Sequence, residues 1–226
     1  MLDDLARWKN DKDFWIEGDS SDYHVLYKAA QEIAINDISG LILEIGVRLG
    51  GSAFVTFKAF QDAQGGHYNR RFIGVDCYGS WAPSFTNEMK IAAKRNLFEY
   101  AWENHIDYTL LELEDTEFIE RYADGVPTYN RTLWETKGKQ YKPDDIEWKR
   151  TINEYSLVHL DGPHRMEDVV VETDFFEPRV VQGGIIVYDD VDKPKKYDHD
   201  VFEPTLLVRG WELIERTGSK ASYRKL

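Results

Sequence analysis

The amino-acid sequence predicts an α/β protein with a Rossmann-like, doubly wound sheet of about seven mostly parallel strands, an antiparallel last strand and helices on both faces. Two observations predict this fold. Short apolar runs rich in β-branched residues alternate with segments of helical spacing, as in βαβ units. Several of these runs also end abruptly in glycine or an acidic residue, as buried parallel strands do where their carboxyl ends reach a cleft.

Each apolar run is assigned to a strand and each helical pattern to a helix. A first helix is expected at Tyr23–Ile38, ahead of the first strand. Gly183-Gly184 indicates the end of a helix just before the fifth strand. The predicted strands cover 41–45, 72–75, 108–113, 157–160, 185–188, 211–214 and 222–226, and the other helices lie near 54–60, 89–101, 169–176 and 201–207.

We interpret residues 1–226 as one domain with an N-terminal helical segment, 1–39, and an insertion, 125–153. The insertion is rich in Tyr, Trp, Lys and Asp and poor in aliphatic residues. A loop of this length within a compact domain is typical of a lid, a substrate wall or disorder. We expect a partly ordered lid.

Composition limits the function. The chain has 226 residues, is 42% hydrophobic and carries a formal net charge of -13, which suits one core and disfavours nucleic-acid or membrane partners. A single cysteine, Cys77, excludes an internal disulfide. The acidic N-terminus does not resemble a signal peptide, and no apolar run approaches the roughly 20 residues of a membrane helix. We expect a cytoplasmic protein whose partner is a small-molecule substrate. The sequence leaves homo-oligomerisation open.

A glycine loop follows the first predicted strand. Glu44 is the next-to-last residue of the apolar run 41–45, and Gly46, Gly50 and Gly51 follow, with Ser52 placed to cap the next helix. The spacing is not the G-x-G-x-x-G of a dinucleotide-binding turn. An acid at this point is unfavourable beside phosphate but suits a cationic ammonium group. The loop therefore predicts a cofactor that carries an amino group.

Acidic residues end the next two strands as well. Asp76 ends the second strand, where an acid accepts hydrogen bonds from both hydroxyls of a ribose. Asp115 follows the third strand and is a candidate partner for an adenine amino group, and Thr116 is expected to cap a helix there. These residues and the glycine loop predict a nucleoside cofactor.

A second group of polar residues follows the fourth and fifth strands. Asp161 and His164 come after one, and Asp189 with Asp190 after the other. Adjacent strand ends meet at one edge of an open sheet, so these side chains are expected to converge. Three carboxylates and an imidazole suit a divalent cation together with a base.

The order of these motifs resembles the class I S-adenosylmethionine-dependent methyltransferases and, more narrowly, the macrocin O-methyltransferase (TylF-like) family. The resemblance spans roughly residues 23 to 226, apart from the insertion. The residues that carry it are Glu44–Gly51, Gly74–Asp76, Asp161-Gly162 with His164, and Gly183–Asp190.

The resemblance implies S-adenosylmethionine as cofactor, with Asp161 among the residues that bind it, and a magnesium ion with Asp161, Asp189 and Asp190 as ligands or near-ligands. It also implies His164 as the general base, with Asp161 as the second catalytic residue. It further implies transfer of a methyl group to a hydroxyl of a small molecule such as a sugar or glycoside. Trp81, which follows the predicted ribose-binding acid, is a candidate to stack on the adenine.

The sequence also leaves alternatives. Pro163 stands where the family commonly has another acid, so His199 is a second candidate base. A non-catalytic module that binds S-adenosylmethionine would use the glycine loop without the acidic cluster. A nicotinamide-dependent oxidoreductase is disfavoured by the glycine spacing and by Glu44.

Overall fold

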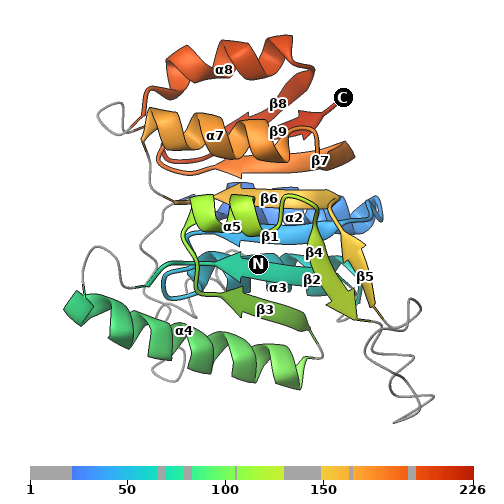
Figure 1. The fold of residues 1–226 in the computed structure, drawn as a ribbon. Helices are drawn as coiled ribbons and strands as arrows, with labels where there is room; N and C mark the ends of the chain where they lie inside the picture. The colour runs from blue at the N-terminus through green and yellow to red at the C-terminus, as the bar shows by residue number, and fades with distance from the viewer. Residues whose placement is uncertain are drawn as a thin grey trace.

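The fold is built on a seven-stranded sheet with the strand order β3-β2-β1-β6-β7-β9-β8 (Figure 1). The computed structural model describes residues 22–65, 70–78, 83–104, 106–129, 149–162, 165–192 and 197–226. The first five strands in this order pair in parallel, and β9 pairs antiparallel with both of its neighbours. The predicted Rossmann-like fold is confirmed. The strands are β1 (Leu41–Ile45), β2 (Arg71–Val75), β3 (Asp107–Leu111), β6 (Tyr155–Leu160), β7 (Val180–Tyr188), β8 (Trp211–Arg216) and β9 (Ala221–Lys225).

Helices cover both faces of the sheet. Successive side chains of a strand point to opposite faces, so Ile42 packs in one apolar cluster while Leu41 and Leu43 pack in the other. Every residue of β1 and β6 is buried, as expected for strands covered on both faces. The first cluster includes α2 (Tyr23–Ile35), α3 (Gly51–Ala63) and α4 (Pro83–Glu103); the second includes α5 (Asp115–Arg121), α7 (Met166–Phe176) and α8 (His199–Val208).

The glycine pair before the fifth predicted strand lies inside that strand. β7 begins at Val180 rather than Ile185, and Gly183 adopts a φ of 78°. The pairing of β6 with β7 shifts register between Tyr155 and Leu157. The interpretation of Gly183-Gly184 as the end of a helix is therefore wrong. The glycines lie where the strand pairing is irregular, and a positive φ there favours glycine.

Two predicted helix caps are also wrong. Helix α3 has Gly50, at a φ of 92°, as its N-cap, and Ser52 lies in its first turn. Helix α5 has Glu114 as its N-cap, in a reciprocal arrangement with Glu117, and Thr116 lies in its first turn. Because Ser52 is not the cap, its side chain is available for a hydrogen bond to Glu44.

The ends of the predicted insertion form a separate two-stranded antiparallel sheet, β4 (Val126–Tyr129) with β5 (Lys149–Ile152). Residues 130–148 and the first part of the N-terminal segment, 1–21, lie outside the described residues. Among the helices that the structure describes, none has the length and apolarity needed to cross a bilayer. Cys77 is not in a disulfide.

The carboxyl ends of the central strands are drawn tightly together. The Gly46 N–H donates to the Val75 carbonyl at 2.8 Å, and the Asp161 N–H donates to the Ile45 carbonyl at 2.9 Å. Gly46 has a φ of 88°, and a Cβ atom added there would overlap the carbonyl group of Asp161. Only glycine fits this close approach, which brings the glycine loop against the residue that follows β6.

We predict that Gly46→Ala lowers the free energy of unfolding by more than about 2 kcal/mol, because the side chain adds a backbone clash to the cost of a positive φ. Gly210→Ala is the matched control, since Gly210 has a φ of 89° with open space around it. The control should lose only about 1 to 2 kcal/mol. Urea unfolding of both variants measures the difference, and equal losses would contradict the close approach.

Candidate active site at the carboxyl ends of the strands

The glycine loop lies between β1 and α3, over the end of the sheet. Gly50 packs against the Leu97 side chain, and a Cβ added there would come within 2.6 Å of it. Gly51 is the first residue of α3. The Ser52 hydroxyl donates a hydrogen bond to the buried carboxylate of Glu44. Glu44, the residue predicted to bind an amino group, is therefore in direct contact with the first turn of α3.

Asp76 holds the glycine loop from the neighbouring strand. Its Oδ2 accepts the Arg48 N–H at 2.7 Å, and its Oδ1 accepts the Tyr78 N–H at 2.8 Å. Both partners have positive φ, 48° and 40°, which these bonds help to stabilise. A carboxylate has about four lone-pair sites, so Asp76 retains acceptor capacity for a ligand.

Asp115 is the first residue of α5, beyond the end of β3. Its Oδ2 is buried and has no hydrogen-bond partner among the described residues. Burial raises the pKa of the Asp115 carboxyl, and the nearby Asp168 raises it further. An unpartnered acceptor of this kind fits a donor on a ligand, such as an exocyclic amino group.

Glu44 and His159 form a buried pair on adjacent strands. They are register partners in the β1–β6 ladder, so their side chains share one face of the sheet. Glu44 is 1% exposed and His159 2%. The His159 Nδ1 lies 3.0 Å from Glu44 Oε1, and the other carboxylate oxygen, Oε2, is buried without a partner in the described part of the chain.

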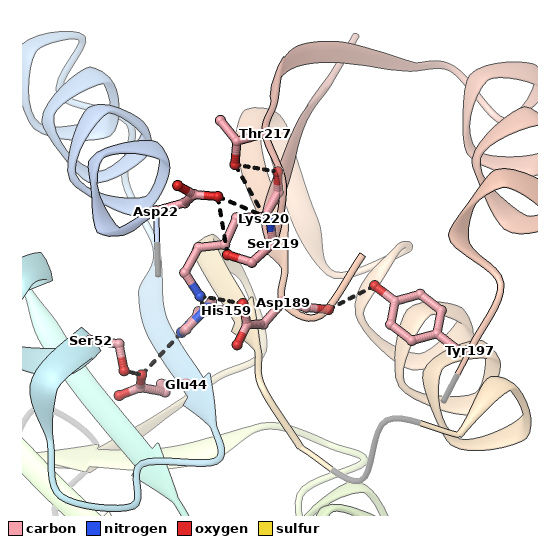
Figure 2. A network of polar contacts seen from close by, with 9 residues as sticks. All are labelled: Asp22, Glu44, Ser52, His159, Asp189, Tyr197, Thr217, Ser219 and Lys220. Atoms are coloured by element: carbon pink, nitrogen blue, oxygen red, sulfur yellow. Dashed lines mark hydrogen bonds and ion pairs between the residues drawn. The ribbon is translucent and has the colours of Figure 1, made fainter. Parts of the chain in front are cut away.

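Lys220 extends this pair into a longer buried network (Figure 2). Its side chain is fully buried, and its Nζ donates to Asp189 Oδ1 at 2.7 Å and lies 3.4 Å from His159 Nε2. An ammonium group only donates, so His159 Nε2 accepts and Nδ1 carries the proton that is donated to Glu44. The network thus runs from Ser52 through Glu44, His159 and Lys220 to Asp189.

Backbone pairing positions the ammonium group. Tyr188 pairs with Ala221 across β7 and β9, and the next residues outward are Asp189 and Lys220. The turn before β9 is closed by a hydrogen bond from the Thr217 N–H to the Lys220 carbonyl at 2.9 Å.

Contacts from outside the β8–β9 turn fix both ends of the ion pair. Asp22, which precedes α2, accepts the Ser219 N–H at 2.9 Å, and this bond is the main reason that the pKa of Asp22 is lowered. The Asp189 N–H donates to Leu160 and its carbonyl accepts the Tyr197 hydroxyl.

Asp189 is an anion in this environment. Burial alone would raise the pKa of its carboxyl, but the Lys220 charge, a hydrogen bond with Asp161 and His159 together hold that pKa below its ordinary value. Asp161 is close enough to contribute to this shift, so its side chain lies near Asp189 at this edge of the sheet.

The three predicted magnesium ligands do not form a metal site in the described residues. Asp189 is already paired with an ammonium group, and Asp190 is 5% exposed with a φ of 56°. Within the ranges that the structure describes, no group of three or more His, Cys, Asp or Glu residues is arranged to hold a metal ion. Magnesium prefers octahedral oxygen ligation and retains several waters. The arrangement therefore does not fit magnesium, and the predicted metal site is not confirmed.

The predicted base and stacking residue, His164 and Trp81, lie outside the described residues, as does Pro163. His199, the alternative base, is 1% exposed, and its Nε2 contacts the Tyr223 hydroxyl at 2.7 Å. Burial lowers the pKa of His199 to about 4. A buried imidazole committed to a core tyrosine is poorly placed to receive a proton from a substrate, which argues against His199 as the base.

The sequence analysis missed His159 and Lys220. His159 gave a usable signal, because it is a polar residue within an apolar strand predicted to lie beside Glu44. No pattern in the sequence indicates a role for Lys220, because a lysine in the polar turn Thr217–Lys220 is expected to be exposed to solvent.

This sheet order, with a glycine loop after β1 and acids after β2, β6 and β7, defines a Rossmann-like nucleotide-binding fold with its candidate site at the carboxyl ends of the strands. A family sequence model described as a methyltransferase domain matches residues 43–191, more than half of the chain. The chain therefore belongs to the methyltransferase domain family. A search of the curated proteins gave no significant match.

Solved structures show the same fold at low identity. CalS11, a TDP-rhamnose 3'-O-methyltransferase of calicheamicin biosynthesis, is 20% identical with a TM-score of 0.55, over 99% of this chain and 79% of that one. The O-methyltransferase TomG from Streptomyces achromogenes, in complex with SAM, is 14% identical with a TM-score of 0.55, over 99% and 88%. The SAH-bound Podospora anserina methyltransferase PaMTH1 is 15% identical with a TM-score of 0.54, over 100% and 87%.

We predict that Lys220→Met lowers the free energy of unfolding by about 3 to 5 kcal/mol, because it leaves the Asp189 carboxylate buried and unpaired. Lys28→Met is the control: Lys28 pairs with Glu215 at 2.8 Å but its side chain is 59% exposed, and such pairs contribute less than about 1 kcal/mol.

Adding Asp189→Asn to Lys220→Met should recover more than about 1 kcal/mol, since the two residues interact directly. Urea unfolding of the single and double variants gives this coupling. Strictly additive losses would mean that the two groups do not form an ion pair.

Proposed function

We propose that this protein is an S-adenosylmethionine-dependent O-methyltransferase that acts on a hydroxyl of a small molecule. The observation that carries the proposal is the buried, unpartnered Oε2 of Glu44 beside the glycine loop. A buried carboxylate oxygen without a partner is costly, and an ammonium group of a ligand would satisfy it. Membership of the methyltransferase domain family supports the same reading.

The residues of the loop and the neighbouring strand ends fit the proposed cofactor. Glu44 receives its amino group, Asp76 its ribose hydroxyls and Asp115, through the unpartnered Oδ2, its adenine amino group. Trp81 is proposed to stack on the adenine. When bound, S-adenosylmethionine supplies an electrophilic methyl group for transfer to a hydroxyl oxygen.

The residues after β6 are proposed to serve the acceptor. Asp161 lies beside Asp189 and orients the acceptor hydroxyl, while His164 takes its proton, a role that suits an imidazole at neutral pH. The insertion, 125–153, is proposed to act as a lid over the acceptor. A sugar or glycoside-like acceptor is supported by the fold shared with a TDP-rhamnose 3'-O-methyltransferase.

Several narrower expectations stay predictions: membership of the macrocin (TylF-like) family, a cytoplasmic location and homo-oligomerisation. Magnesium dependence, which the family resemblance implies, is not part of the proposal, and no step of the proposed reaction is assigned to a metal, because the acids as arranged in the described residues do not fit one.

We predict that the chain binds S-adenosylhomocysteine and that Glu44→Gln weakens this binding by about 10- to 100-fold, the loss expected for one hydrogen bond between charged groups. Calorimetric titration measures both affinities. Glu212→Gln, on β8 and paired with Arg224, is the control and should bind like the wild type.

Transfer of a labelled methyl group from S-adenosylmethionine to a panel of hydroxylated sugars and glycosides tests the reaction itself. Methyl transfer that is lost on substitution of Asp161 or His164 would support the proposal that the protein is an O-methyltransferase. Binding without transfer to any acceptor would favour the non-catalytic module, and no binding at all would refute the proposal.

A further inference from the structure

A lysine ammonium group lies where the sequence predicts a metal ion. Lys220 Nζ lies 2.7 Å from Asp189 Oδ1, at the meeting point of Asp161 and Asp189. We propose that Lys220 is the resident cation of these acidic strand ends, that it neutralises Asp189 in place of magnesium, and that magnesium therefore does not bind at Asp189. This inference rests on the proposed function, because it assumes that the acidic strand ends belong to the methyltransferase site.

The position of the Lys220 ammonium group is fixed by the backbone around it. The β7–β9 register sets Lys220 opposite Asp189, and the turn that carries Lys220 is tied to the start of α2 through Asp22 and Ser219. The side chain is fully buried, so it is not one of the flexible lysines that sample several partners. A residue held by the sheet and by a turn from both sides stays at this position.

A divalent cation at Asp189 would have to displace this lysine. The neighbouring ring nitrogen, His159 Nε2, also faces the ammonium group, so a second ligand atom is engaged by the same cation. A metal beside the ammonium would meet like-charge repulsion in a buried setting, where charges are poorly screened. A metal that pushed the lysine aside would leave an ammonium buried without its partner.

Lys220 acts as a positioning residue. Lys220 pairs with Asp189 and donates to His159 Nε2, which sets the tautomer of His159. His159 in turn holds Glu44 Oε1, while Glu44 Oε2 has no partner among the described residues. The acceptor side and the cofactor side of the site are thus joined by one buried chain of contacts (Figure 2).

The test is a calorimetric titration of magnesium chloride into the full chain saturated with S-adenosylhomocysteine. Wild type and Lys220→Arg, which keeps the charge, should show no saturable binding at millimolar magnesium. Lys220→Met should bind magnesium saturably, with a dissociation constant at least about tenfold below the highest magnesium concentration at which the wild type shows no binding, and adding Asp189→Asn should abolish that binding. Thermal unfolding with and without magnesium gives an independent readout, because a ligand that binds only the native state raises the midpoint.

Saturable magnesium binding by the wild type that Asp189→Asn removes would overturn the proposal. A folded Lys220→Met variant that gains no magnesium affinity would also overturn it, since the lysine would then not be what occupies the site. If Lys220→Met does not fold, the comparison of wild type with Asp189→Asn decides alone. Failure of S-adenosylhomocysteine to bind would refute the proposed function instead, and the titration of magnesium into the unliganded chain would still test the lysine.

Discussion

The buried ion pair between Lys220 and Asp189 is the interaction on which the arrangement of the site depends. Parallel strands that end in acids place several carboxylates at one edge of the sheet, where burial disfavours their charge. Lys220 supplies the opposite charge from the residue just before β9, the strand that pairs antiparallel with β7. Without that pair, the acidic edge would have to be open to water or neutralised by a ligand.

The same pair reaches the cofactor side of the sheet through His159. Glu44 and His159 face one another because their strands are in register, and Lys220 completes the row on the same face. The Glu44 carboxylate has one oxygen bound by Ser52 and His159 and the other unpartnered. The protein thereby holds one acceptor ready for a ligand, at the position where a glycine loop lets a ligand approach the backbone.

The sequence was sufficient for the fold because each strand is a short apolar run that ends in a distinctive residue, as at Glu44-Ile45-Gly46 and Gly74-Val75-Asp76. Local patterns were less reliable at element ends. Gly183 reads equally well as a helix end or as an irregularity within a strand, and Ser52 reads as a cap although its hydroxyl bonds to Glu44.

The charge balance of the site could not be predicted, because it depends on a contact across 31 residues of sequence between Asp189 and Lys220. The acids can be recognised in the sequence because they follow apolar strands. A lysine in a polar turn has no neighbouring residues that indicate its burial. Only the register of an antiparallel strand, which local patterns do not specify, brings the two together. A magnesium ion was expected beside these acids, and the structure places the Lys220 ammonium group against Asp189 instead.

The central claim is that this buried network holds Glu44 ready for the amino group of the cofactor. A crystal structure of the chain with S-adenosylhomocysteine tests it most directly. The account predicts the cofactor nitrogen at about 3 Å from Glu44 Oε2, with Lys220 still bonded to Asp189. A bound cofactor whose amino group lies elsewhere, leaving Glu44 Oε2 without a partner, would contradict it.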